Sequence, residues 1–326
     1  MHKQLNIKLT RQFEWQWGIK PKLVNLIHNI IWKRSHSCLI CLCFIAALCY
    51  SSSLKASENI VQKLRESGVL TVGARTDASP FSFRLADNKF AGFAIDLMEE
   101  ISNGISDDLQ VKITVNMVPI TYNERLQVVQ TNKVDIVCGD ATPTWEREKK
   151  VDFSVPFFID GIRLLTFNKT AVSGLFGLHR KIIGATKGST AIHAIQSHLP
   201  NAHIKLFSST ELGINALKEE SIDVFAGDGV TLEVAKMKSK QEHNLTILPK
   251  SGVLLWGSIS CILPENQSEF RDLVNFQLMK LLEGVDEFSG KYVKIYSRWF
   301  GIDGMLNYPL DKIRQTKLSS SNIWLK

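Results

Sequence analysis

Two segments of the chain follow one pattern, and this repetition limits the folds that the chain can adopt. Residues 121–140 read TYNERLQVVQTNKVDIVCGD, and residues 209–228 read STELGINALKEESIDVFAGD. In each segment, a helix-like periodicity leads through a polar turn to Asp, two apolar residues, one further residue and Gly-Asp. A helix that feeds a buried strand is the repeating unit of mostly parallel α/β sheets. The repetition therefore predicts two α/β lobes of like topology.

The other periodicities extend this alternation of strands and helices through both lobes. In the first lobe we expect helices at residues 59–68, 90–105 and 121–133, and strands at residues 70–74, 111–119 and 134–139. In the second lobe we expect strands at residues 181–190 (with a turn), 202–207 and 222–228, and helices at residues 190–199 and 209–221. Each lobe is thus expected to be a mostly parallel sheet flanked by helices.

Two extended apolar segments, residues 157–169 and 251–264, join the lobes. Two crossings mean that the chain leaves the first lobe, builds the second and returns. We therefore place lobe 1 at residues 57–161 and 256–326, and lobe 2 at residues 162–255. Sheets of this kind bind ligands at the C-terminal ends of their strands, which predicts a ligand cleft between two hinged lobes.

Residues 1–56 have the composition of an export leader. The first 37 residues carry seven Lys or Arg against one acidic residue, Glu14, and so hold about six of the net charge of +7. Since the rest of the chain is almost neutral, the basic balance does not indicate a nucleic-acid-binding surface. The thirteen apolar residues 38–50 are shorter than a membrane span of about 20 residues and match the apolar core of a signal peptide. A buried core helix and an uncleaved anchor are the alternatives, and no clean cleavage site is present.

Cysteine usage agrees with export. Four of the six cysteines lie in residues 38–49 and would leave with a cleaved leader, so Cys138 and Cys261 are the two in the folded part. An oxidising compartment permits a disulfide between them, but each lies in an apolar, strand-like run. The sequence leaves two states open, namely one disulfide or two buried thiols.

Five further stretches occur in a fixed order along the chain. They are residues 72–83 (VGARTDASPFSF), 91–101 (AGFAIDLMEEI), 134–158, 182–191 and 292–301, and the IDVFAGD run at residues 222–228 belongs to the same order. These stretches resemble the bacterial extracellular solute-binding proteins, family 3, which serve polar amino-acid ABC transporters. The resemblance implies a two-lobed periplasmic binding protein type II fold, with a ligand held between lobes that two hinge crossings connect.

The resemblance assigns one half of an amino-acid clamp to residues 138–153. Arg147 would hold the α-carboxylate of the ligand, because a guanidinium offers a rigid pair of donors. Thr142 and Asp140 occupy positions where the family has small hydroxyl residues; Thr142 fits that role and Asp140 departs from it. Without the resemblance, Arg147 would be interpreted as a surface residue of a charged helix.

The second lobe would supply the other half of the clamp. The resemblance implies that Asp228, at a strand end, receives the ligand ammonium. Ser189 and Thr190 would complete the carboxylate site at a helix N-terminus. From the residues alone, Asp228 would instead cap the helix that follows it, and the KGST turn of residues 187–190 is only a helix-start signal.

Arg75 would decide which side chain is bound. In the family, binders of basic amino acids have an acidic residue at the matching position, whereas glutamate/aspartate binders have arginine. A positive group favours an acidic ligand, but Asp140 could pair with Arg75 and neutralise it. Ala78 replaces an aromatic residue that often stacks on the ligand. Three other aromatic residues could form a lid or belong to the core: Phe81, Phe83 and Trp145. Acidic amino acids are therefore expected first, with neutral polar or basic ones still open.

The expected function is capture of an amino acid and its delivery to an inner-membrane ABC permease. The protein would be a periplasmic monomer that needs no cofactor and binds no nucleic acid. The eight histidines lack the spacing of a structural zinc site, and no GxxxxGK[ST] phosphate loop is present, so the ATPase would be a separate chain. Two alternatives stay open: an enzyme of the cyclohexadienyl dehydratase type on the same fold, and a membrane-anchored amino-acid sensor.

Overall fold

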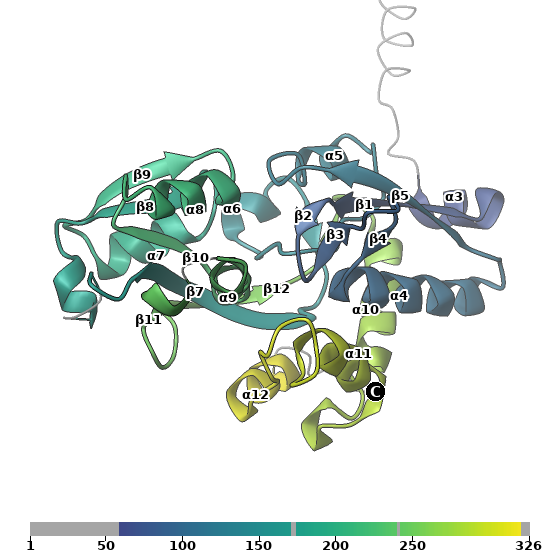
Figure 1. The fold of residues 1–326 in the computed structure, drawn as a ribbon. Coiled ribbons are helices and arrows are strands. Elements are labelled where there is room, and N and C mark those ends of the chain that lie inside the picture. Colours follow the sequence, from purple (N-terminus) through teal and green to yellow (C-terminus); the bar gives the residue numbers. More distant parts are fainter. Residues whose placement is uncertain (1–58, 171–173, 240–241, 321–326) are drawn as a thin grey trace, which may run out of the picture. The chain divides into compact units, whose positions relative to one another are not determined.

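The computed structural model describes residues 59–170, 174–239 and 242–320, so the leader predicted at residues 1–56 lies outside the described residues. Among the residues that it describes, no helix is both long and apolar enough to cross a membrane. The unit that begins at Asn59 consists of sheets with helices packed on them (Figure 1). The expected α/β class is therefore confirmed.

The first sheet is built as the sequence pattern predicts. β1 (Val69–Arg75) and β5 (Thr114–Ile120) pair in parallel along their whole length, so that Arg75 lies opposite Ile120 at their C-terminal ends. The connection between them holds a small antiparallel sheet and one long helix: β2 (Asp77–Ala78), β3 (Ser82–Arg84), β4 (Phe90–Ala91) and α4 (Phe93–Leu109). The apolar face of α4 packs into the main core of the protein.

Local sequence fixes the helix that precedes this sheet. α3 (Ile60–Ser67) begins at Asn59, whose side chain accepts a hydrogen bond from the Gln62 N–H, and ends at Gly68. Gly68 has φ of 63°, a left-handed conformation that glycine adopts without a steric penalty. The predicted helix at residues 59–68 and its stop at glycine are thus confirmed.

Three predicted elements of this lobe differ from the structure. The helix expected at residues 121–133 is reduced to turns and the single-turn α5 (Gln127–Gln130), and the Tyr122 carbonyl accepts a hydrogen bond from the Arg125 guanidinium in place of a helical N–H. The strand expected at residues 134–139 forms only isolated bridges, at Ile136 and Val137. The helix expected at residues 90–105 begins only at residue 93, since residues 90–91 belong to β4.

The second lobe contains the larger sheet. Its strand order is β11 (Leu245–Leu248), β7 (Phe158–Phe167), β10 (Val224–Asp228), β8 (Ile182–Thr186) and β9 (His203–Phe207). β8 is parallel to both β9 and β10, whereas β7 is antiparallel to β10 and β11. Val224 and Ala226 pack with α7 (Ala191–His198), and Phe225 packs on the other face with α8 (Thr210–Lys218). Helices therefore cover both faces, as a sheet with buried parallel strands requires.

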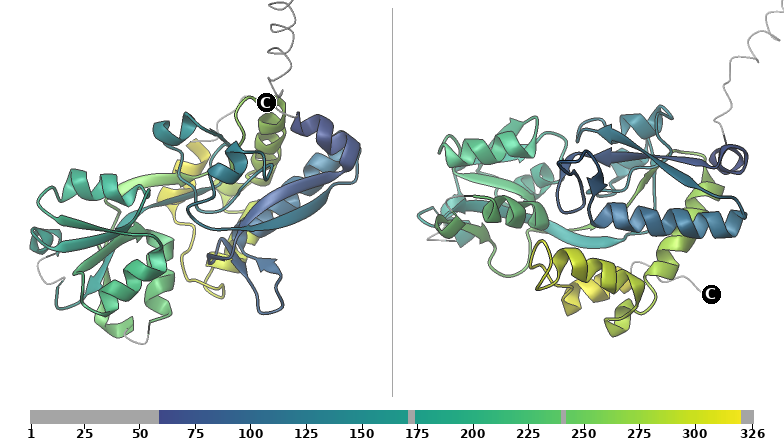
Figure 2. Two further views of the ribbon diagram at one scale, coloured as in Figure 1. Left: turned by 90° about the horizontal axis from the view of Figure 1, so that it is seen from above. Right: turned by 45° about the vertical axis from the view of Figure 1, so that its right-hand side comes forward.

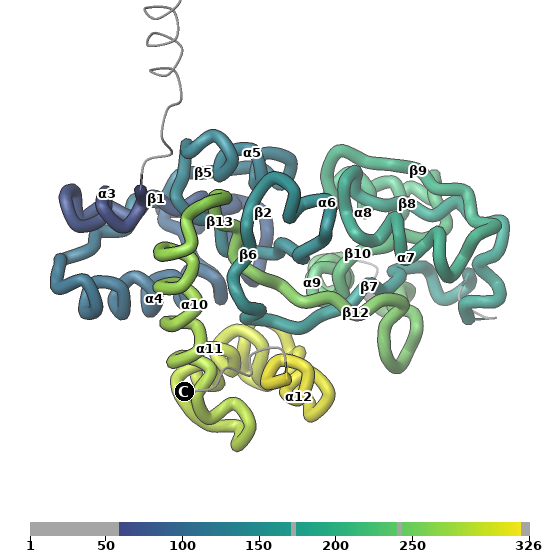
Figure 3. Tube along the Cα trace, turned by 180° about the vertical axis from the view of Figure 1, so that it is seen from behind, coloured from purple at the N-terminus to yellow at the C-terminus, as the bar shows by residue number. Residues whose placement is uncertain are grey.

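Two long strands form the crossings that the apolar segments predicted. β7 pairs with β12 (Leu255–Ile259) through its first half, from Phe158↔Ile259 to Ile162↔Leu255, and with β10 through its second half. β13 (Ile262–Leu263) then pairs with β6 (Asp152–Phe153) on the return. Figures 2 and 3 show β7 and β12 running side by side between the two groups of elements. The lobe boundaries proposed from sequence remain a prediction.

Cys138 and Cys261 form a disulfide bond, which selects one of the two states that the sequence left open. Their Cα atoms are 4.2 Å apart, and the bond spans 123 positions of sequence. Since Cys138 precedes β7 and Cys261 follows β12, the bond closes the whole segment that builds the second lobe. Both cysteines are buried, and each adjoins the Val137↔Ile262 bridge.

The chain ends in helices that pack on the main core. They are α10 (Ser268–Leu281), α11 (Gly290–Phe300) and α12 (Lys312–Ser320). Buried rings join this end of the chain to α4 and β7, since Phe93 packs edge-on against Phe158 with ring centroids 5.7 Å apart and against Phe300 at 5.3 Å. Burial of each such side chain contributes about 1.5–3 kcal/mol. The remaining short elements are α6 (Trp145–Glu148), α9 (Gly229–Met237), η1 (Gly174–Leu178), η2 (Glu242–Asn244) and η3 (Val285–Glu287).

Candidate functional site

Polar side chains gather where parallel strands end. β1 ends at Arg75, β5 leads into residues 121–126, and the segment that bridges to β1 at Ile136 leads to Asp140. In the second lobe, β8 leads to the turn at residues 187–190, and β10 ends at Asp228. Because parallel strands direct their C-terminal ends to one edge of the sheet, each lobe presents these side chains on a single edge.

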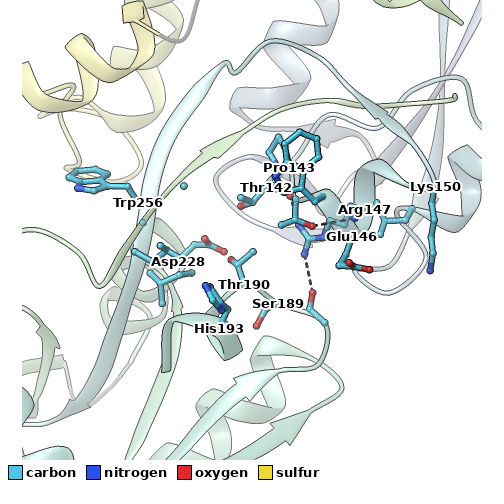
Figure 4. A pocket seen from close by; sticks show the side chains of 18 residues that line it. Thr142, Pro143, Glu146, Arg147, Lys150, Ser189, Thr190, His193, Asp228 and Trp256 are labelled. Atoms are coloured by element: carbon cyan, nitrogen blue, oxygen red, sulfur yellow. Dashed lines mark hydrogen bonds between the residues drawn. The ribbon is translucent and has the colours of Figure 1, made fainter. Parts of the chain in front are cut away.

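A cavity of about 770 Å³ brings five of the seven predicted site residues together (Figure 4). The five are Thr142, Arg147, Ser189, Thr190 and Asp228. They come from both lobes, since α6 and the loop before it supply two, and the β8 turn and β10 supply three. Residues that the sequence did not indicate also line this cavity, among them Pro143, Glu146, Lys150, His193 and Trp256.

Arg147 lies at the centre of the cavity, on α6. The hydroxyl of Thr144 caps this helix and accepts a hydrogen bond from the Arg147 N–H. The guanidinium donates from Nη1 to the Thr142 carbonyl and from Nη2 to the Gly188 carbonyl, 2.9 Å away in the second lobe. Burial and the nearby Arg125 lower the pKa of Arg147, and the negative charges of Asp228 and Asp140 only partly oppose this shift. No carboxylate of the described residues lies within ion-pair distance of Arg147, so the site is prepared for an anion.

The second lobe faces Arg147 with two groups whose bonding capacity is unused. The Ser189 hydroxyl is buried and has no hydrogen-bond partner among the described residues. Asp228 precedes α9, but its side chain makes no capping hydrogen bond, so the helix-cap alternative is wrong. Burial, together with the nearby Asp160 and Asp140, raises the pKa of Asp228 to about 7. A cation at this carboxylate would lower that pKa and stabilise the charged form.

Arg75 and Asp140 lie in a second cavity of about 360 Å³ and bind each other. Nη1 of Arg75 is 3.1 and 2.9 Å from the two Asp140 oxygens, and Nε is 2.8 Å from Asp77. Burial opposes the charge on Asp140, but Arg75 and Arg125 outweigh it and hold the Asp140 pKa below its ordinary value. The predicted pairing of Arg75 with Asp140 is therefore present, and the Arg75 charge is compensated.

Tyr122 and Arg125 lie near Arg147, Tyr122 also contacts the Arg75 guanidinium, and the sequence reasoning missed both. The Arg125 guanidinium lies 3.6 Å from the centre of the Tyr122 ring, and the Arg75 guanidinium lies 5.1 Å from the same ring. Arg125 is 5% exposed, and its Nε atom has no hydrogen-bond partner among the described residues. The sequence could have indicated both residues by their position, because they lie in the loop that follows β5, a strand parallel to β1.

The three aromatic lid candidates lie in different environments. Phe81 is a core residue, with its ring centroid 5.0 Å from that of Phe158. Phe83 packs edge-on against Trp299. Trp145 is 85% exposed and lines the larger cavity, so it is the candidate with freedom to cover a ligand. Ala78 lines the smaller cavity.

Known proteins resemble this chain in sequence and in fold. The L-glutamate/L-aspartate-binding protein of Pseudomonas aeruginosa is 28% identical over 289 residues, covering 82% of this chain and 91% of that protein. The cyclohexadienyl dehydratase of the same organism is 30% identical over 123 residues, which are 38% of this chain and 42% of that enzyme. Among solved structures, an ancestral arginine-binding protein bound to arginine matches with a TM-score of 0.60 and 26% identity, over 72% of this chain and 99% of that one.

The sequence model of one family covers most of the chain. It matches residues 70–302, a range that includes every predicted site residue and both crossing strands. The expectation drawn from the five ordered stretches is thus confirmed. This chain belongs to the bacterial extracellular solute-binding proteins, family 3.

Proposed function

We propose that this protein captures an acidic amino acid, glutamate or aspartate, in the periplasm and delivers it to an ABC permease of the inner membrane. Arg147 binds the α-carboxylate, with Thr142, Ser189 and Thr190 completing its hydrogen bonds. Asp228 binds the ammonium. The support is the convergence of these five side chains on one cavity, with a buried guanidinium that has no ion-pair partner among the described residues on one side and a carboxylate that makes no capping hydrogen bond on the other.

The charge balance of the site carries the preference for an acidic ligand. Three guanidiniums (Arg75, Arg125, Arg147) are close to two carboxylates (Asp140, Asp228), and a third carboxylate, Asp77, is 57% exposed and therefore screened by water. Asp160, the other carboxylate near Asp228, has Arg314 as a nearby positive charge, so this pair adds no net charge. The site thus has an excess of about one positive charge. Glutamate or aspartate brings two carboxylates and one ammonium and neutralises it. A neutral amino acid leaves the excess positive charge in place, and a basic amino acid doubles it. Unpaired charge in a partly buried site costs binding free energy.

The preference for an acidic ligand does not depend on Arg75 alone, because Arg125 supplies a second positive charge. Arg75 is already paired with Asp140 and Asp77, whereas no carboxylate of the described residues lies within ion-pair distance of the buried Arg125. We assign the acidic preference to the Arg75–Tyr122–Arg125 cluster as a whole. The side chain of the ligand would approach it from the cavity that Arg147 lines.

Capture requires contacts from both lobes. Arg147 and Thr142 belong to the first group of elements, and Ser189, Thr190 and Asp228 to the second. A ligand that bridges them favours the state in which both groups are close, and the paired strands β7 and β12 are the segments that would flex. Delivery to a permease, the periplasmic location and a monomeric state are inferred from the family.

The decisive comparison is between glutamate and glutamine, which differ in charge and scarcely in shape. Isothermal titration calorimetry with the leaderless protein should give a dissociation constant at least tenfold lower for L-glutamate than for L-glutamine, with no binding of L-arginine. Tighter binding of glutamine or arginine would refute the acidic preference. Failure of all twenty amino acids would refute the function itself.

The likeness to the dehydratase supplies a second candidate, catalysis on the same fold. The observation that favours it is the pKa of about 7 for Asp228, a value that suits a general acid. Against it, Arg147 and Asp228 face each other as partners for the two ends of an amino acid. Purified protein incubated with prephenate or arogenate should form no product, and turnover of either compound would favour the enzyme.

A further inference from the structure

The C-terminal segment, residues 303–320, begins where the family model ends and returns to the crossing strands. Three of its apolar side chains are buried in the main core: Leu306, Tyr308 and Leu318. Gln315 is fully buried and donates to the Val285 carbonyl, which attaches α12 to η3. Figure 1 shows α12 close to β7, in agreement with their contacts. The segment is therefore an integral part of the fold.

A chain of hydrogen bonds leads from this segment to the site. Arg314 donates from Nη2 to the Tyr308 hydroxyl at 2.6 Å, and that hydroxyl donates to Oδ1 of Asp160 at 2.9 Å. Oδ2 of Asp160 accepts from the Val230 N–H, also at 2.9 Å. Asp160 is 1% exposed, so each of these bonds is shielded from water.

Asp160 lies on the crossing, next to the residue that would bind the ligand ammonium. It pairs with Gly257 across β7 and β12, and two positions further along β7 Ile162 pairs with Asp228. The Val230 N–H that it accepts belongs to the first turn of α9, which begins directly after Asp228. The Asp160 carboxylate thus holds the start of the helix that fixes the Asp228 backbone.

Glycine at position 229 permits this contact. A Cβ atom there would lie 2.8 Å from Oδ1 of Asp160 and 2.9 Å from the Tyr308 hydroxyl, closer than Cβ contacts allow. The hydroxyl, the carboxylate and the backbone that follows Asp228 are therefore packed without a gap. A shift of Tyr308 is transmitted to the Asp228 backbone.

The same segment reaches the other wall of the larger cavity. Nζ of Lys317 lies 5.0 Å from the centre of a Trp256 ring, and Trp256 lines the cavity on β12. Val230 and Val234 of α9 share the main core with Leu306, Tyr308 and Leu318. The C-terminal segment is thus in contact with both strands of the crossing and with the helix behind Asp228.

We propose that the C-terminal segment positions Asp228 for the ligand ammonium through the chain Arg314, Tyr308, Asp160 and the Val230 N–H. This role rests on the proposed function, since it assigns the ammonium to Asp228. Tyr308, Arg314 and Asp160 are positioning residues, because none of them lines the larger cavity. They fix the position of the Asp228 carboxylate, which does line the cavity.

Two tyrosine variants form a matched test. Tyr308→Phe removes the hydroxyl that bonds Asp160, and Tyr292→Phe removes an equally buried hydroxyl that donates to the Phe157 carbonyl at 2.7 Å and does not reach Asp160. The probes are L-glutamate and glutarate, which lacks the α-ammonium; weak glutarate binding is measured by competition. Tyr308→Phe should raise the dissociation constant for glutamate about tenfold, equivalent to about 1.4 kcal/mol, and leave that for glutarate unchanged. Tyr292→Phe should change neither constant.

The melting temperature of each ligand-free variant separates stability from positioning. Tyr308→Phe is expected to lower it more than Tyr292→Phe, because the Tyr308 hydroxyl makes two hydrogen bonds, with Arg314 and Asp160, and the Tyr292 hydroxyl makes one. Equal effects of Tyr308→Phe on glutamate and glutarate, or no effect on glutamate, would overturn the proposal. If another amino acid binds in place of glutamate, the acidic preference fails, and that amino acid and its deamino analogue become the probes for positioning. If no amino acid binds, both proposals fail.

Discussion

Ligand affinity is expected to fall steeply as the pH is lowered from 8 to 5.5, because the ligand ammonium requires the ionised form of Asp228. Burial, with Asp160 and Asp140 adding to it, raises the Asp228 pKa from 3.8 to about 7 in the ligand-free protein. A bound ammonium stabilises the carboxylate and lowers this pKa again. Binding below pH 7 must therefore release a proton, and affinity is lost as the pH falls through 7.

The size of the effect follows from the ionised fraction of Asp228. With a pKa of about 7, roughly 90% of the carboxyl groups are ionised at pH 8 and about 3% at pH 5.5. The dissociation constant for L-glutamate should then rise about 30-fold over this range, equivalent to about 2 kcal/mol. Arg147 keeps its charge throughout and contributes nothing to the change.

Calorimetry at pH 8, 7, 6 and 5.5 measures this dependence directly. Repeating each titration in two buffers of different ionisation enthalpy counts the protons that are released. Asp228→Asn serves as the control and should bind weakly, with no change between pH 8 and 5.5. A wild-type dissociation constant that is the same at pH 8 and pH 5.5, with no proton released, would refute the assignment of the ammonium to Asp228.

Substitutions of Arg147, of the Arg75–Asp140 pair and of the two cysteines test other parts of the account. Arg147→Lys keeps the charge but loses the paired donors, so binding of every α-amino acid should weaken at least tenfold in calorimetry, and Arg147→Ala should abolish it; wild-type affinity in either variant contradicts the clamp. Arg75→Ala should reduce the ratio of glutamate to glutamine affinity and lower stability by leaving Asp140 unpaired, whereas Arg75→Ala combined with Asp140→Ala should recover the stability in thermal melts. Replacing Cys138 and Cys261 by Ser should cost about 5 kcal/mol in chemical unfolding, since the bond spans 123 positions, and an unchanged unfolding midpoint would show that the bond adds nothing.

Much of the fold could be predicted because it depends on local patterns. The strands at residues 70–74, 202–207 and 222–228 alternate or run apolar as buried strands do, and the structure has strands there. The failure at residues 121–133 has a local cause that periodicity does not record. The Tyr122 carbonyl accepts a hydrogen bond from the Arg125 guanidinium, where a helix would use it for a backbone N–H.

The site was predictable only in part. A strand end followed by a polar residue identifies candidates such as Asp140 and Asp228, but their partners depend on which loops meet in space. The contact of Tyr122 with Arg75 arises from the parallel pairing of β1 with β5 and could not be inferred from spacing along the chain. For the same reason the sequence left the state of the two cysteines open, since they lie 123 positions apart.

Tyr308 and Arg314 show a second reason why the sequence could not predict the whole site. They lie beyond the stretches that resemble the family, and nothing in the pattern of residues 303–320 points to a ligand. Their link to Asp228 exists because the segment folds back onto Asp160. Such contacts across long sequence distances require the structure.

The most direct measurement of the central claim is a calorimetric titration of the leaderless protein with L-glutamate and L-glutamine at pH 8. An excess of about one positive charge at the Arg75–Tyr122–Arg125 cluster and Arg147 predicts at least tenfold tighter binding of glutamate. Equal or tighter binding of glutamine would contradict the account.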